Sequence, residues 1–184
     1  MLNISAQITP NPNALKFVVD KQIIPQKALD FPFADSAKGS PLVEQLWAID
    51  GVCGVMVGPY FVTVNKTNDT DWAKLVEPVT DVIKTVLDSD IAPISQEKLD
   101  SLNSGPSEDD EIVQKIKAIL DNEIRPAIAM DGGDVSFESY DDGVVALQLQ
   151  GACSSCPSSV LTLKMGIENR LREEIPEIKE IIQV

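Results

Sequence analysis

Residues 131–157 read DGGDVSFESYDDGVVALQLQGACSSCP, and this stretch decides the fold of the second half of the chain. Asp131-Gly-Gly-Asp134 and Asp141-Asp-Gly143 have the composition of turns, and each is followed by a run of strand-forming residues. The pattern predicts a hairpin of Val135–Tyr140 and Val144–Gln150. The loop that leaves its second strand then carries two cysteines three residues apart.

Helical patterns lie on both sides of the hairpin. Before it, apolar residues between positions 112 and 124 share one helical face, and Pro126 is predicted to stop that helix. After it, Ser158–Glu174 again has helical spacing, and a short last strand, Ile178–Val184, can add to the hairpin. Helix, hairpin, helix and strand predict a compact α+β domain over residues 108–184.

The first half of the chain also mixes strand and helix patterns, which predicts a second α+β domain over residues 1–88. Ser40 followed by Pro41 is a good helix start, and Pro78 is placed to kink or split the last helix of this region. The expected elements are strands Ile4–Ile8 and Leu15–Val19, helix Pro41–Ile49, hairpin strands Val52–Val57 and Phe61–Asn65, and helix Asp71–Leu87.

Residues 89–107 lose apolar periodicity and gain proline, serine, glycine and acidic residues, so they are predicted to form a flexible acidic linker. Ser107 is the expected N-cap of the next helix, with the acidic residues 108–111 in its first turn. The predicted fold class is therefore α+β, as two small α+β domains joined by this linker.

Charge and composition exclude several functions. The chain has 15 basic and 29 acidic residues, and its net charge of −14 would repel nucleic acid and anionic membranes. It has no histidine, which removes Ser-His and Cys-His nucleophile pairs and histidine-based zinc sites. The first ten residues show no export or organelle signal, so the sequence predicts a cytoplasmic protein whose three cysteines are not a disulfide framework.

Cys153 and Cys156 are the candidate functional residues. Their spacing lets both sulfurs converge on one metal or close on each other, and Pro157 fits the first position of the following helix. The first amides and the dipole of that helix would stabilise a thiolate, the form needed for metal binding or nucleophilic attack. Two serines between the cysteines are expected to leave the sulfurs reachable.

Zinc sites, redox disulfides and iron-sulfur sites all use this spacing. A cluster or a zinc ion takes four ligands, whereas one chain supplies two thiolates here, so two chains meeting at the loop would complete the set. A thiol-disulfide oxidoreductase is the alternative. It ranks second because the motif is expected to follow a hairpin and not the opening strand of a βαβ unit. A zinc-stapled dimer ranks third.

A family resemblance narrows these options. Asp131-Gly-Gly-Asp-Val135, Gly151-Ala-Cys-Ser-Ser-Cys-Pro-Ser-Ser159 and Thr162-Leu-Lys-Met-Gly-Ile-Glu168 resemble the NifU-like (Nfu) C-terminal domain, over about residues 108–184. Thr9-Pro-Asn-Pro-Asn-Ala-Leu-Lys-Phe17 and Tyr60-Phe-Val-Thr-Val-Asn-Lys66, with Ser40-Pro-Leu42, resemble the Nfu N-terminal domain.

The resemblance implies a protein that is not an enzyme. It implies assembly, storage or delivery of iron-sulfur clusters, with a 4Fe-4S cluster bridging two subunits through Cys153 and Cys156 of each. The implied partners are cluster-donating machinery, recipient apoproteins and a second copy of the chain.

Two further features have simpler interpretations. Cys53 lies in an expected half-buried strand and is interpreted as a small core residue, not as a third ligand. The two carboxylates of Asp131-Gly-Gly-Asp134 are attributed to a turn, since a calcium site would gather more oxygen ligands. The first domain, which offers no ligand set, is expected to select partners.

Overall fold

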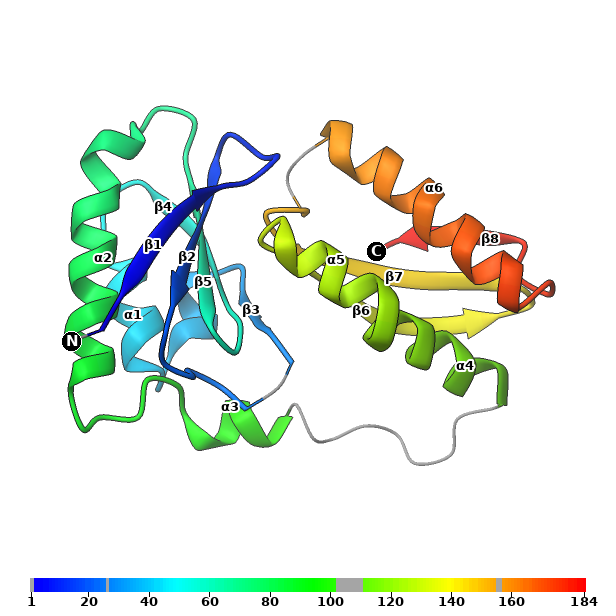
Figure 1. The fold of residues 1–184 in the computed structure, drawn as a ribbon, viewed down its shortest axis with the longest axis horizontal. Coiled ribbons are helices and arrows are strands. Elements are labelled where there is room, and N and C mark those ends of the chain that lie inside the picture. The colour runs from blue at the N-terminus through cyan, green and yellow to red at the C-terminus, as the bar shows by residue number, and fades with distance from the viewer. Residues whose placement is uncertain (1, 26, 102–110, 155–156) are drawn as a thin grey trace. The chain divides into compact units, whose positions relative to one another are not determined.

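The computed structural model describes all residues except 1, 26, 102–110 and 155–156 (Figure 1). The chain divides into two compact units, Met1–Gly105 and Pro106–Val184, and each contains helices and one sheet. The predicted α+β class with two small domains is confirmed. The N-cap expected at Ser107 lies outside the described residues.

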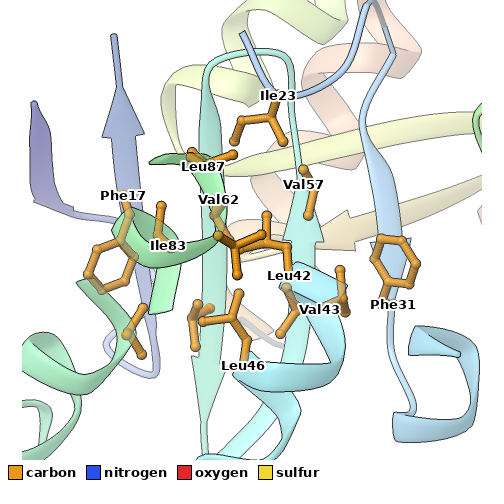
Figure 2. Close-up of a cluster of buried hydrophobic side chains, with 14 of the residues drawn as sticks. Phe17, Ile23, Phe31, Leu42, Val43, Leu46, Val57, Val62, Ile83 and Leu87 are labelled. Atoms are coloured by element: carbon orange, nitrogen blue, oxygen red, sulfur yellow. The ribbon is translucent and has the colours of Figure 1, made fainter. Parts of the chain in front are cut away.

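The first unit is a five-stranded sheet with helices on one face (Figure 1). The strand order is β1-β2-β5-β4-β3, and every neighbouring pair is antiparallel. The elements are β1 Ile4–Ile8, β2 Ala14–Val19, β3 Leu29–Phe31, the 3-10 turn η1 Ala34–Ala37, α1 Pro41–Trp47, β4 Val52–Val57, β5 Phe61–Lys66, α2 Trp72–Asp88 and α3 Gln96–Ser101. Alternate strand residues such as Phe17 and Val62 pack against Leu42 and Leu46 of α1 and Ile83 of α2 (Figure 2).

Pro78 was predicted to kink or split this helix. Helix α2 runs through Pro78 as one helix of 17 residues, so the split does not occur. Its carboxylate cap, Asp71, accepts a hydrogen bond from the amide of Ala73 at 3.1 Å. The buried face of Leu75, Val79 and three further apolar residues packs on the sheet on both sides of the proline. This burial outweighs the loss of one backbone hydrogen bond.

Residues 89–101 are folded onto the first unit and are not a linker. Ile94 is buried in the core of that unit, and Leu99 packs against it. The Leu42 amide donates to the Pro93 carbonyl at 3.1 Å, and the Ser95 amide donates to Ser40 Oγ at 3.3 Å. The segment has too few apolar residues to show a period, which is why its composition resembles that of a linker.

The second unit has three strands in the order β6-β7-β8, with two helical segments on one face (Figure 1). Strands β6 and β7 are antiparallel, as predicted, whereas β7 and β8 are parallel. The elements are α4 Glu111–Ile119, the π-helical segment η2 Leu120–Ile124, α5 Arg125–Met130, β6 Gly133–Asp141, β7 Val144–Gly151, α6 Pro157–Glu174 and β8 Glu180–Gln183. Because α6 connects two parallel neighbours, β7, α6 and β8 form a βαβ unit.

Pro126 does not stop the helix, contrary to the prediction. The wider π-helical turn precedes it, and the Arg125 amide donates to the carbonyl of Leu120, five residues back. A proline ring in a regular helix clashes with the carbonyl four residues earlier, and the wider turn relieves that clash. The chain therefore continues as α5 to Met130.

Candidate functional site

The cysteine loop leaves the end of β7 and enters α6, which begins at Pro157 as predicted. Gly151 ends the strand opposite Gly133 of β6, and both Gly151 and Gly132 adopt positive φ, +65° and +76°. The Ala152 amide donates to the Gly132 carbonyl at 3.2 Å. The loop is thus fastened to the Asp131-Gly-Gly-Asp134 turn, and glycine relieves the steric cost of positive φ in both segments.

The side chain of Cys153 lies against the backbone of Gly133. A Cβ on Gly133 would overlap Cys153 Sγ and would come within 3.0 Å of Cys153 Cβ and of Ile128 Cγ2. Cys153 is 6% exposed and belongs to the core of the second unit. The expectation that its sulfur is reachable is therefore wrong for this conformation, because the missing side chain at position 133 leaves room for the thiol to turn inward.

Ser154 is exposed and stabilises the first turn of the loop. Its hydroxyl and its amide both donate to the Gly151 carbonyl, at 2.8 and 3.3 Å. Cys156 lies outside the described residues, so the structure does not bring the predicted pair together or separate it. The pairing of Cys153 with Cys156 at one metal remains a prediction.

Asp134 of the turn is a structural residue. Its carboxylate accepts a hydrogen bond from Arg125 Nη1 at 3.0 Å and one from the Val135 amide at 2.7 Å. Arg125 also donates to the Val135 carbonyl at 2.9 Å and pairs with Asp121 at 3.1 Å. The carboxylate is nearly fully buried, so these bonds fix the start of β6 against α5. The turn interpretation fits, and the described residues contain no group of three His, Cys, Asp or Glu side chains able to hold a metal ion.

The sequence did not single out Gly133 or Arg125. The paired glycines of the turn were visible, but only the fold shows which one faces Cys153. Arg125 gave no signal at all, because its partner is set by the π-helical turn that brings the residue over the start of β6.

Cys53 is exposed and is not the core residue that the strand pattern predicted. Pairing of β4 with β5 passes from Val52 opposite Lys66 to Gly54 opposite Asn65, so a bulge leaves Cys53 outside the regular register. Partial burial of the thiol raises its pKa above the ordinary value, and the nearby Lys66 ammonium opposes that rise. A raised pKa leaves less thiolate at neutral pH.

Comparison with known proteins identifies the family. The NifU-like domain family matches residues 116–182, and the family described as scaffold protein Nfu/NifU N terminal matches residues 4–90. The human protein named NFU1 iron-sulfur cluster scaffold homolog, mitochondrial, is 46% identical over an alignment of 184 residues that covers 98% of this chain and 71% of that protein. This chain belongs to the Nfu family. The resemblance found in both halves of the sequence is confirmed.

Other Nfu relatives agree in name. The Drosophila persimilis protein, also named NFU1 iron-sulfur cluster scaffold homolog, mitochondrial, is 39% identical over 182 residues. The match takes in 98% of this chain and 64% of the fly protein. Among solved structures, a NifU-like protein from Saccharomyces cerevisiae overlaps 52% of this chain and 87% of its own, with 26% identity and a TM-score of 0.47.

The names of these Nfu relatives contradict the predicted cytoplasmic location. Both the human and the fly protein are named mitochondrial. The prediction rested on the absence of a signal in the first ten residues, and that absence is no guide to location. Within the described residues, no helix combines the length and the apolar character needed to cross a bilayer.

Proposed function

We propose that this Nfu chain is a non-catalytic iron-sulfur cluster scaffold and carrier. Cys153 and Cys156 of two subunits hold one 4Fe-4S cluster between them, and the protein passes that cluster to recipient apoproteins. Cluster-donating machinery supplies it. The cluster is cargo in this proposal, so its site must release it as well as bind it.

The position of the cysteine loop carries the proposal. Cys153 lies where β7 meets α6, in a turn fastened to the Gly132 carbonyl. Two thiols per loop satisfy half of the four-thiolate shell of a cluster, and the described residues add no metal-binding group that would complete it. The names of the human and fly relatives, iron-sulfur cluster scaffolds, favour this cargo over zinc.

Because the Cys153 thiol is buried, cluster binding requires a change in the conformation of the loop. In this conformation Sγ packs over Gly133, so cluster binding must be accompanied by a change in the loop that turns Cys153 outward. Without a cluster the inward position protects the thiol, because oxidation and disulfide exchange require access to sulfur.

A thiol-disulfide oxidoreductase is the second candidate, and one observation favours it. The topological argument against it fails, since β7, α6 and β8 form a βαβ unit with Cys153 at the strand-helix junction. The buried state of Cys153 weighs against it, because exchange needs an accessible thiolate. Family membership places the scaffold role first.

Anaerobic reconstitution with ferrous iron and sulfide tests the proposal. The expected product is brown, with four irons and four sulfides for every two chains. Cys153→Ser and Cys156→Ser should each abolish cluster binding, whereas Cys53→Ser, the matched control, should leave the iron content unchanged. Transfer is then followed as activation of an apoprotein that requires a 4Fe-4S cluster.

Two results would contradict the scaffold assignment. The first is a colourless protein that, given a dithiol as electron source, reduces a disulfide substrate in a reaction that needs both loop cysteines. The second is loss of about half the iron in Cys53→Ser, which would make Cys53 a ligand.

A further inference from the structure

Three large apolar side chains lie exposed beside the cysteine loop. Met130 is 77% exposed, Leu161 64% and Met165 58%. Met130 ends α5, and the loop is hydrogen-bonded to the turn that follows it through Ala152 and Gly132. Leu161 and Met165 lie in the N-terminal half of α6, the helix that follows the loop.

The C-terminal end of α5 and the N-terminal end of α6 lie at the same end of the second unit. Figure 1 shows the C-terminal end of α5 and the N-terminal end of α6 at the end of the sheet where β7 stops and the loop begins. Leu161 and Met165 are four residues apart in a helix, so they are neighbours on its surface. We call Met130, Leu161 and Met165 the apolar rim, because α5 ends at the turn that is hydrogen-bonded to the loop and α6 follows the loop.

The rim is not part of the core of its own unit. Helix α6 packs inward through Ile167 and Leu171, both nearly fully buried. At 100° per residue, Leu161 and Met165 lie well away from that buried face. Large apolar side chains gathered at one functional loop are typical of a contact surface.

We infer that the rim of Met130, Leu161 and Met165 is the contact surface between two copies of this chain when they share a cluster. The inference rests on the proposed function, in which each loop brings two of the four thiolates. Two loops that meet at one cluster bring the residues beside them together. In a two-fold interface the same patch meets itself, and apolar surface is complementary to itself.

The small area of the rim favours a second copy, which the shared cluster also holds, over a stable hetero-partner. The net charge of −14 opposes a second copy at long range, so the contact between two copies needs a surface without acidic groups at its centre. Three side chains cover much less than the about 800 Å² per partner that a stable interface buries. The rim alone therefore cannot hold a dimer, whereas the rim together with shared iron-thiolate bonds can, and the contact is lost once the cluster leaves.

The methionines suit a contact that forms and breaks. A methionine side chain is unbranched and polarizable, and it adapts its shape to the surface that it meets. Two of the three rim residues are methionine, so the same surface can adjust as the loop turns Cys153 outward.

The test is the dissociation constant of the cluster-loaded dimer, measured by sedimentation at several protein concentrations under anaerobic conditions. Met130→Gln, Leu161→Gln and Met165→Gln replace exposed side chains, so folding should be unaffected. Each should raise the dimer dissociation constant about fivefold to tenfold, with cluster content per chain recorded on the same samples. Val184→Gln, which changes a residue 62% exposed just after the last strand, is the matched control and should leave the constant unchanged.

Four outcomes decide the matter. Weakened dimers in the rim variants alone support the inference. Unchanged dimers in all three variants overturn it. Rim variants that load cluster and dimerise normally but fail to transfer it to an apoprotein also overturn it, since the rim would then contact the recipient while the scaffold function stands. A parent protein that binds no cluster refutes the proposed function itself, and the inference with it.

Discussion

Gly133 determines where the Cys153 thiol can lie. Because a Cβ at position 133 would overlap Sγ, Gly133→Ala must displace the thiol or shift the turn. We expect a loss of about 1–3 kcal/mol in the free energy of unfolding, as for other overpacked sites, and faster alkylation of Cys153. Urea unfolding and a thiol-labelling time course measure the two effects.

Gly166→Ala is the matched control for that substitution. Gly166 lies within α6, and a Cβ there would meet nothing within 4 Å. Alanine should stabilise the helix by about 0.5–1 kcal/mol because glycine loses more backbone freedom on folding. If Gly133→Ala proved as stable as Gly166→Ala, with Cys153 labelled no faster than in the parent, the role given to Gly133 would be wrong.

For single residues, the sequence predicts which side chains carry the chemistry better than it predicts where those side chains lie in the fold. Cys153 and the turn glycines stand out by residue type, but the burial of Cys153 depends on a residue twenty positions earlier that the hairpin register brings opposite the loop. Cys53 shows the same limit. Its strand was predicted correctly, yet a single bulge turned an expected core residue outward.

Among the elements, segment 89–101 offers the clearest test of how the first unit is built. Ile94 is 1% exposed in the core, whereas Ile91, three residues earlier, is 61% exposed. Ile94→Ala should lower the free energy of unfolding of the first unit by about 2–5 kcal/mol through lost burial and a cavity. Ile91→Ala should change it by less than about 0.5 kcal/mol.

Chemical denaturation, followed by the fluorescence of the two tryptophans, reports on this unit, since Trp47 and Trp72 both pack against its core. Equal effects of the two alanine substitutions would mean that the segment does not dock on the core in solution. In that case the linker would begin near residue 89, as the composition suggests.

Helices and strands were predicted correctly where the segment has a clear hydrophobic period. The prediction failed where contacts with distant residues determine the structure. The strands Ile4–Ile8 and Val52–Val57 were predicted with the bounds that the structure gives. Strand β3 has three residues and α3 six, too few to show a period. The predictions for Pro78 and Pro126 considered only the effect of a proline on its own helix. In the structure α2 continues through Pro78 because its apolar face packs on the sheet, and the π-helical turn accommodates Pro126.

For the whole molecule, the packing of residues 89–101 on the first unit shortens the segment that can act as a linker. The remaining stretch, Asn103-Ser-Gly-Pro-Ser107, keeps the composition of a linker. Limited proteolysis should therefore cut first after residue 101 and before α4, giving two fragments that resist further digestion. Mass spectrometry of the early fragments identifies the cut. A first cut between residues 91 and 101 would show that Ile94 does not protect its segment.

Cluster binding and association of two chains should be coupled. If a cluster needs four thiolates and each chain brings two, the cluster binds only where two chains meet, so its binding free energy also drives association. The protein without cluster should therefore be monomeric and the reconstituted protein dimeric at the same concentration. The net charge of −14 opposes association in dilute salt, so added salt should strengthen the loaded dimer.

Light scattering coupled to size separation, run without oxygen, measures both states. Cys153→Ser and Cys156→Ser should stay colourless and monomeric after iron and sulfide are added, because each leaves a pair of chains with only two of the four thiolates. A monomer that carries a full cluster would show that one chain completes the ligand shell. A dimer that persists in both serine variants would show that protein contacts alone hold the subunits together, and the small apolar rim would then be only part of a larger interface.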